Sequence, residues 1–168
     1  MPEPILTVSD LTVTFPSEAG TVRAVQNLNY EVRSGEALAI VGESGSGKSV
    51  SSLAVMGLLP DTATISGGIE FMGQDLFSLN DRRLSQLRGD KISMIFQDPL
   101  SALTPVYTIG DQIAEAIRLH HPQVSRAASA DRAVQLLESV GIPEARRRAR
   151  QFPHEFSRGL RQRAMIAV

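Results

Sequence analysis

The sequence predicts an α/β fold built around a phosphate-binding loop, and three observations carry this prediction. An apolar run at 36–41 leads into a glycine-rich loop, and a run with helical spacing follows at 48–59. Near residue 97 the pattern changes from strand-like alternation to helical periodicity. The loop itself fills every fixed position of G-x-x-x-x-G-K-[ST], reading Gly42-Glu43-Ser44-Gly45-Ser46-Gly47-Lys48-Ser49.

The first part of the chain reads as strands joined by short turns. Alternating, β-rich residues predict strands over 5–15 and 22–33, separated by a turn at 16–20. The apolar runs at 36–41 and 91–96 are typical of buried parallel strands. A short strand is expected at 69–72 and an exposed helix from Asp81 to Arg88. The helix after the loop is expected to stop at Leu59-Pro60-Asp61.

The second part reads as helices, so we divide the chain into 1–97 and 98–168. Helices are predicted over 109–121 and 125–140, with Ser125 as a candidate N-cap and Gly141 as a stop. Their apolar faces are expected to hold Ile109, Ile113, Ala116, Ile117 and His120 on the first helix, and Ala130, Val134, Leu137 and Val140 on the second.

The loop chemistry predicts binding of a nucleoside triphosphate with Mg²⁺. Glycines at 42, 45 and 47 let successive backbone N–H groups point inward, and the following helix N-terminus favours anionic oxygen atoms. Lys48 is expected to reach the β- and γ-phosphates, while the Ser49 hydroxyl ligates Mg²⁺. The alternative is a chance Gly/Ser-rich turn before a helix, which the preceding strand pattern disfavours.

Composition limits the remaining function classes. The 168 residues suit one domain with a subdomain, and 42% hydrophobic content is enough for a core. A net charge of −1 gives no general attraction to nucleic acid, and the lack of cysteine fits the cytosol and excludes thiolate metal sites. We expect no signal peptide at Met1-Pro2-Glu3-Pro4 and no membrane span, which needs about 18–20 apolar residues.

Further motifs resemble the ATP-binding subunit of ATP-binding-cassette (ABC) transporters, specifically oligopeptide and dipeptide importers. The resemblance covers essentially the whole chain. Beyond the phosphate loop, it rests on Met94-Ile95-Phe96-Gln97-Asp98-Pro99, Ser101-Ala102-Leu103-Thr104-Pro105-Val106, Gly110-Asp111-Gln112-Ile113-Ala114-Glu115, Phe152-Pro153-His154-Glu155-Phe156-Ser157 and Arg161-Gln162-Arg163-Ala164-Met165-Ile166-Ala167. It implies an incomplete ABC-type nucleotide-binding domain with an antiparallel β subdomain and an α-helical subdomain.

The resemblance assigns roles to individual residues. Gln97 would contact Mg²⁺ and the attacking water, where an amide can both donate and accept a hydrogen bond. Phe15 would stack on adenine, although strand periodicity alone favours a core phenylalanine. The implied metal ligands are Ser49 and Gln97, and the implied ATP contacts are Phe15, Gly42, Ser44, Gly45, Ser46, Gly47, Lys48, Ser49, Val50, Ser157 and Gly159.

The signature sequence departs from the family pattern at one position. The family usually has Leu-Ser-Gly-Gly, whose serine and glycine amides contact the γ-phosphate held by the opposite subunit. Here Phe156 precedes Ser157, and Arg158 stands where the first glycine is expected before Gly159. We expect Arg158 to impair the signature by blocking close backbone approach. The alternative is that its cationic side chain pairs with phosphate.

In the family, an apolar strand ends in an Asp-Glu pair, in which the Asp holds Mg²⁺ and the Glu is the general base, and a switch histidine follows. The 168 residues contain no apolar strand followed by such a pair, and no such histidine. A missing general base costs about 10²–10⁴-fold in rate. We therefore expect the domain to stop before this strand, and the chain alone to be nearly inactive as an ATPase.

The function implied is energy coupling in an importer of peptides or similar solutes. Its partners would be a second ABC ATPase subunit, identical or different, and integral-membrane permease subunits at the cytoplasmic face of the inner membrane. Two alternatives remain open: a soluble ABC-type ATPase acting on nucleic acid, and a non-catalytic remnant. Seven arginines between 146 and 163 could suggest nucleic acid, but a solvated helical face explains them better and no nucleic-acid partner is expected. His120, His121 and His154 do not have metal-site spacing.

Overall fold

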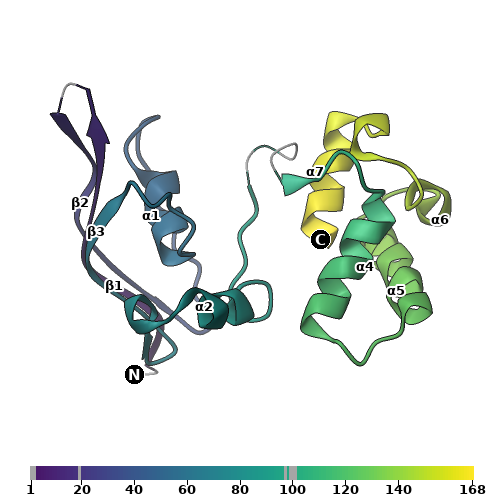
Figure 1. Ribbon diagram of the computed structural model, residues 1–168, viewed down its shortest axis with the longest axis horizontal. Coiled ribbons are helices and arrows are strands. Elements are labelled where there is room, and N and C mark those ends of the chain that lie inside the picture. Colours follow the sequence, from purple (N-terminus) through teal and green to yellow (C-terminus); the bar gives the residue numbers. More distant parts are fainter. Residues whose placement is uncertain (1–2, 19, 97, 99–101) are drawn as a thin grey trace. The chain divides into compact units, whose positions relative to one another are not determined.

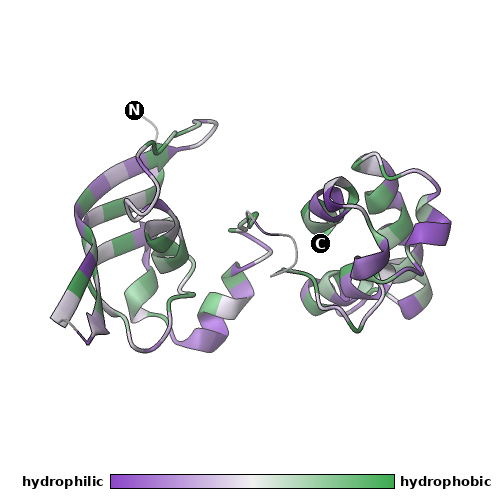
Figure 2. Cartoon of the chain, turned by 90° about the horizontal axis from the view of Figure 1, so that it is seen from above, coloured by the Kyte–Doolittle hydropathy of each residue, from purple (hydrophilic) through white to green (hydrophobic). Residues whose placement is uncertain are grey.

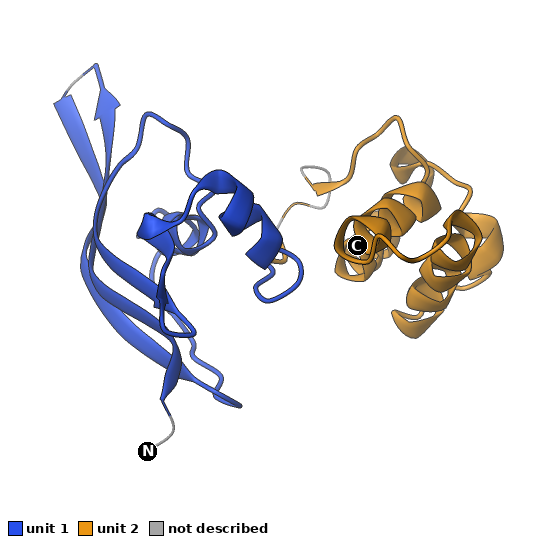
Figure 3. Cartoon of the chain, turned by 60° about the horizontal axis from the view of Figure 1, so that its bottom comes forward, with its two compact units in different colours: residues 1–93 blue, residues 94–168 orange. Residues whose placement is uncertain are grey.

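The structure is a computed structural model that describes residues 3–18, 20–96, 98 and 102–168. It contains two compact units, residues 1–93 and 94–168, which Figure 3 shows in different colours. The predicted boundary at Gln97 falls on a residue outside the described ones, so the functional division at that point stays a prediction.

The first unit contains a four-stranded antiparallel sheet. Its strands are β1 (Pro4–Ser17), β2 (Gly20–Arg33), β3 (Thr64–Phe71) and β4 (Gln74–Asp75), in the order β2-β1-β3-β4 (Figure 1). In the register, Val8 on β1 lies opposite Tyr30 on β2 and Ile69 on β3. Hydrophilic and hydrophobic bands alternate along these strands in Figure 2, as expected for a sheet with one buried face.

Helix α1 (Lys48–Val55) packs on the sheet and closes the core of the first unit. Its buried residues are Ser51, Ala54 and Val55. The core joins Ala54 and Val55 to side chains from three strands and the turn after them: Val8, Leu11, Val13, Val25, Ile69, Phe71 and Leu76. The helix that carries the phosphate loop is therefore fixed to the sheet by apolar contacts along one face.

Two predicted strands are wrong. Residues 36–41 and 91–96 form no strand, apart from a single bridge between Arg88 and Ile92. Leu38, Ile40 and Val41 are 44%, 41% and 89% exposed, and Ile95 is 63% exposed. Both segments are apolar, but a parallel strand also needs neighbours to complete its hydrogen-bond ladder. Among the described residues no strand pairs with either segment.

Short helices follow the sheet. The 3₁₀ turn η1 (Leu76–Ser78) is capped by Asp75, whose side chain accepts a hydrogen bond from the Phe77 amide at 2.9 Å. Helix α2 (Asp81–Leu87) begins at Asn80, which caps the Arg83 amide at 3.0 Å, and it has no buried residue. The predicted exposed helix from Asp81 is thus confirmed.

The second unit is helical. It comprises α4 (Ile109–His120), α5 (Arg126–Ser139), α6 (Ala145–Arg148), the 3₁₀ turn η2 (Pro153–Glu155) and α7 (Arg158–Ala167). Thr108 caps α4 and Ser125 caps α5 through side-chain oxygens that accept backbone N–H groups, as predicted for Ser125. Gly141, with φ 73°, follows the end of α5 and allows the predicted stop.

The predicted apolar face of α5 is confirmed at Leu137, which is buried, and at Val134 and Val140, which pack against the core of the second unit, but it is wrong at Ala130. Ser129, Ala133 and Leu137 are buried, whereas Ala130 is exposed. Burial of Ser129 is possible because its hydroxyl accepts a hydrogen bond from Arg118 Nη1 at 2.9 Å. On α4 the prediction is closer, since Ile109 and Ile113 are fully buried and Ile117 packs against the same core.

Within the described ranges, none of the helices combines the length and apolar character needed to cross a bilayer.

Candidate phosphate-binding site

The glycine-rich loop joins the extended segment at 36–41 to the first turn of α1. Gly45 and Gly47 have φ angles of 83° and 86°, a left-handed conformation that favours glycine. Gly47 is also packed tightly, because a Cβ atom there would lie 2.2 Å from the Ala24 carbonyl oxygen on β2. The end of the loop is therefore seated against the sheet, and only glycine fits at that point.

Lys48 folds back across the loop. Its ammonium group donates to Gly42 O at 2.7 Å, Glu43 O at 2.6 Å and Ser46 Oγ at 3.1 Å. An ammonium group has three donors, so these contacts use all of its hydrogen-bonding capacity. The positive charge is thereby held within the loop, and the predicted contact of Lys48 with the β- and γ-phosphates stays a prediction.

The first turn of α1 offers backbone donors beside this charge. The Ser51 amide makes the first backbone bond back along the helix, to Gly47 O at 2.9 Å. The N–H groups before it have no acceptor within the helix, and no side chain caps them. Together with the helix dipole, these donors favour an anion at the same place as Lys48.

The remaining predicted loop contacts lie around this turn. Ser44, Ser46 and Ser49 are exposed, and the Ser49 hydroxyl is free to face a ligand at the start of α1. Val50 is half-buried and its side chain packs against the core of the first unit, so only its backbone could serve a phosphate.

Phe15 lies near the end of β1, opposite Val22 on β2. It is half-buried and packs against the core of the first unit. The side chain thus serves packing, while its exposed part leaves the predicted adenine contact as a proposal. Gln97 lies outside the described residues, so its predicted role remains a prediction.

The signature residues begin α7 in the second unit. Ser157 is the N-cap, and its Oγ accepts a hydrogen bond from the Leu160 amide at 3.4 Å. Gly159 is exposed, and a Cβ atom at this position would meet nothing within 4 Å. Arg158, the first helical residue, is exposed and has no positive φ angle. The helix accepts arginine there without backbone strain, so any effect of Arg158 must come from its side chain.

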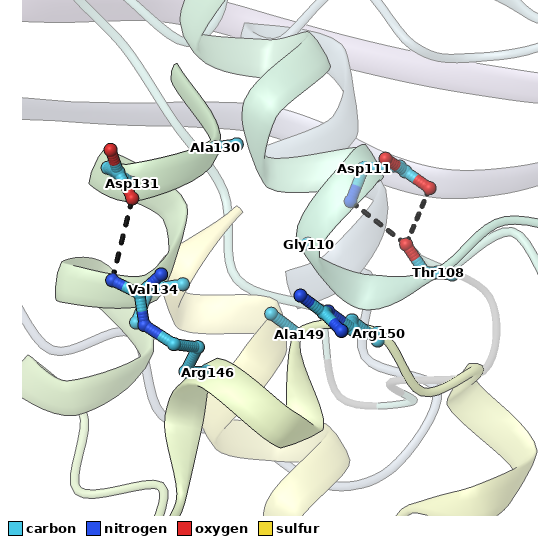
Figure 4. A pocket seen from close by; sticks show the side chains of 9 residues that line it. All are labelled: Thr108, Gly110, Asp111, Ala130, Asp131, Val134, Arg146, Ala149 and Arg150. Carbon is cyan, nitrogen blue, oxygen red and sulfur yellow. Dashed lines mark hydrogen bonds and ion pairs between the residues drawn. The ribbon is translucent and has the colours of Figure 1, made fainter. Parts of the chain in front are cut away.

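Sequence reasoning missed a pocket of about 250 Å³ in the second unit, shown in Figure 4. Both carboxylates have partners: Arg146 pairs with Asp131 at 3.5 Å, and Asp111 accepts from Thr108 at 2.6 Å, whereas the Arg150 guanidinium makes no hydrogen bond or ion pair with another described residue. The Ile109 and Gly110 amides at the start of α4 donate to Gln151 O and Ala149 O. These pairings occupy the two carboxylates and the two helix amides. The lining residues are Thr108, Gly110, Asp111, Ala130, Asp131, Val134, Arg146, Ala149 and Arg150.

Two further electrostatic features bear on the site. Burial raises the pKa of the Tyr30 phenol, which packs against the core of the first unit. In the described part of the chain no three or more His, Cys, Asp or Glu side chains are grouped so that they could hold a metal ion. Ser49 and the phosphate oxygens of a ligand could hold a metal at the loop, while Gln97, the other predicted ligand, lies outside the described residues.

Comparison with known proteins decides the family. The model described as ABC transporter matches residues 25–168, which include the loop and the signature. The chain belongs to the ABC transporter family. This confirms the resemblance seen in the sequence motifs.

Curated relatives in this ABC transporter family include three with closely related names. The oligopeptide transport ATP-binding protein OppD of Mycobacterium bovis is 53% identical over 98% of this chain and 27% of its own length. OppD of Salmonella typhimurium is 48% identical, over 98% and 49%. The dipeptide transport ATP-binding protein DppD of Bacillus subtilis is 46% identical, over 99% and 50%. The chain thus spans about half the length of these relatives or less.

Solved structures agree on the fold. The dimeric structure of MJ0796, a bacterial ABC transporter cassette, matches with a TM-score of 0.83 and 26% identity, covering 96% of this chain and 67% of that one. A dimeric post-hydrolysis state of MJ0796 bound to ADP and Pi matches equally well. The predicted ABC-type α/β fold is therefore confirmed.

Proposed function

We propose that this chain is the nucleotide-binding part of an ABC importer subunit that couples ATP to uptake of peptides or similar solutes. The observation that carries the proposal is the loop with Lys48 held across it and uncapped helix amides beside it. Relatives named as oligopeptide and dipeptide transport ATP-binding proteins support the choice of solute class.

In the proposed site, the phosphates of ATP lie against the loop amides at the start of α1. Lys48 neutralises the β- and γ-phosphates, and the Ser49 hydroxyl provides one ligand for Mg²⁺. Phe15 stacks on adenine with its exposed part, and Gln97 provides the second protein contact to Mg²⁺ and orients water. Bound Mg²⁺ supplies charge neutralisation on the phosphate oxygens.

The proposal includes partners. Ser157 and the Gly159 amide meet the γ-phosphate bound by a second ABC ATPase subunit, and the dimeric state of the similar MJ0796 cassette supports the pairing of two such subunits. Permease subunits would hold the pair at the cytoplasmic face of the membrane. The arginine-rich stretch at 146–163 gives little support to a nucleic-acid role, because several of these side chains are used internally. Arg147 pairs with Glu144, and Arg163 donates to Gly141 O at 2.8 Å.

The full chain is expected to bind MgATP while hydrolysing it at a rate near background. Binding follows from the loop, and slow turnover follows from the absence of an Asp-Glu pair in the 168 residues. Titration calorimetry with MgATP, followed by a phosphate-release assay on the same sample, tests both parts. Absence of MgATP binding would overturn the proposed function, and hydrolysis that depends on Lys48 would overturn the second part.

Arg158→Gly is expected to raise ATP turnover about tenfold in a form of the protein that hydrolyses ATP. Removing the side chain lets a partner's γ-phosphate approach the α7 amides, and one such donor is worth about 10²–10³-fold in comparable sites. Steady-state phosphate release measures the change. Arg158→Lys, which keeps the charge and bulk, is the matched control and should show no gain. A fall in turnover for Arg158→Gly would instead indicate that Arg158 contacts phosphate.

A further inference from the structure

The end of α1 opposite the phosphate loop is closed by a glycine turn. Gly57 has a φ angle of 60°, its amide donates to Ala54 O at 3.0 Å, and the Leu58 amide donates to Leu53 O at 2.9 Å. This pair of bonds is a Schellman motif, which satisfies the carbonyls inside the last turn. The carbonyls of Met56 and Gly57 lie beyond it and need another donor.

Arg88 supplies that donor from a distant part of the sequence. Its Nε donates to Met56 O and its Nη2 to Gly57 O, both at 2.8 Å, across sequence separations of 32 and 31 residues. Nη1 lies 3.5 Å from Asp81 Oδ1, and the Arg88 side chain is 22% exposed. A partly buried cation at a helix C-terminus interacts favourably with the helix dipole. Arg88 is thus held by three contacts at the end of α1.

Gly57 allows this close approach. A Cβ atom at Gly57 would lie 3.1 Å from Arg88 Nη2 and 3.2 Å from Leu84 Cδ1, in addition to the positive φ angle. Arg88 and the last turn of α1 are therefore packed together as well as hydrogen-bonded.

The backbone of Arg88 connects this contact to a second segment. Arg88 is the C-cap of α2 and forms an isolated bridge with Ile92, while the Gly89 amide donates to Ile92 O at 2.9 Å. Ile92 belongs to the segment at 91–96 that leads to Gln97. One residue thus joins the end of α1 to the start of this segment.

We propose that Arg88 is a positioning residue for the phosphate loop. The proposal rests on MgATP binding at the loop. Helix α1 has eight residues and no side-chain cap at its N-terminus, so its axial position depends on its packing face and on its C-terminal end. Arg88 fixes that end, which sets where Lys48, Ser49 and the first-turn amides meet the phosphates. The effect reaches the nucleotide through α1, without contact between Arg88 and the ligand.

The test compares Arg88→Met, Arg88→Lys and the control Arg82→Met in the full chain. Arg82 is an exposed residue on α2, the helix that Arg88 caps, and its side chain makes no hydrogen bond or ion pair within the described residues. MgATP Kd is measured by calorimetry at a temperature where circular dichroism shows each variant to be folded. Hydrogen exchange of the amides in 48–58 is followed on the same samples.

We expect Arg88→Met to raise the Kd about fivefold, since a cation at a helix end and its charge-assisted hydrogen bonds are lost together. Arg88→Lys, which keeps the charge and can donate to one carbonyl, should recover part of the affinity. Arg82→Met should stay within about twofold of wild type. Faster exchange in 48–58 should accompany only the Arg88 variants.

The outcomes separate this inference from the proposed function. If wild type does not bind MgATP, the proposed function fails and this inference fails with it. If wild type binds and Arg88→Met binds equally well when folded, a purely structural role is shown and the inference alone is overturned. Should Arg88→Met not fold, Arg88→Lys decides, because an unchanged Kd with a lower melting temperature contradicts the positioning role.

Discussion

Lys48→Ala is expected to weaken MgATP binding by about 100-fold or more. The substitution removes the ammonium group that donates to Gly42 O, Glu43 O and Ser46 Oγ at the inner edge of the loop. A hydrogen bond to a charged group contributes about 1.5–3 kcal/mol, and losing two such contacts to phosphate corresponds to at least a 100-fold change in Kd. Calorimetric titration with MgATP measures this loss.

The chain provides a matched control for Lys48. Its other lysine, Lys91, is 54% exposed and lies 3.4 Å from Asp90. Lys91→Ala changes net charge equally but should leave the Kd within about twofold. Equal affinities for Lys48→Ala and wild type would show that the nucleotide, if bound, uses another site.

Gly47→Ala is expected to lower the free energy of unfolding by about 3–4 kcal/mol. Two causes act together at this position. The residue has a φ angle of 86°, which strains any side chain, and the added Cβ would lie 2.2 Å from the Ala24 carbonyl oxygen and 3.2 Å from Val25 Cγ2. Relief requires α1 to move away from β2, so MgATP affinity should fall as well. Urea unfolding followed by circular dichroism measures the loss of stability.

Gly45→Ala separates the two causes. Gly45 has nearly the same φ angle, 83°, but a Cβ there would meet nothing within 4 Å. Gly45→Ala should therefore lower the free energy of unfolding through backbone strain alone, by about 1–2 kcal/mol. If Gly47→Ala and Gly45→Ala lose the same free energy of unfolding, the close contact with the Ala24 carbonyl oxygen does not contribute to the destabilisation.

Local patterns predicted most of the fold. The alternation over 5–15 and 22–33 predicted β1 and β2, and Ser125 and Gly141 marked the ends of α5 correctly, because capping and strand alternation are properties of neighbouring residues. The runs at 36–41 and 91–96 failed because a strand is defined by its partners, and the apolar pattern does not contain them.

The burial of Ser129 in place of Ala130 on α5 has a similar cause. A periodicity argument places alanine inside and serine outside, but Ser129 is buried because Arg118 on α4 donates to its hydroxyl. Such a pair is visible only after the two helices pack. The same holds at the end of α1: the predicted stop at Leu59-Pro60-Asp61 is wrong, because the helix ends at Val55 with a turn at Gly57 whose contact with Arg88, 31 residues away, is not visible in the local pattern.

The candidate site also contains some residues whose placement follows from local sequence and one whose placement does not. The phosphate loop is contiguous, so its motif predicted the positions of Lys48 and the glycines, and the left-handed φ angles of Gly45 and Gly47 agree with it. Phe15 is different, because a strand residue can pack inward or face a ligand, and the structure shows it half-buried against the core. Sequence alone leaves that choice open.

The hydrogen bonds between Lys48 and the loop also affect how the loop would bind a nucleotide. The ammonium group is satisfied by two carbonyl oxygens and one hydroxyl of the loop, and these bonds tie Gly42, Glu43 and Ser46 to the start of α1. The site is therefore preorganised: little loop ordering is left to oppose association. When a nucleotide binds, phosphate oxygens replace some of the loop oxygens as hydrogen-bond acceptors for Lys48. The measured affinity therefore reports the difference in free energy between the bonds to phosphate and the bonds to the loop.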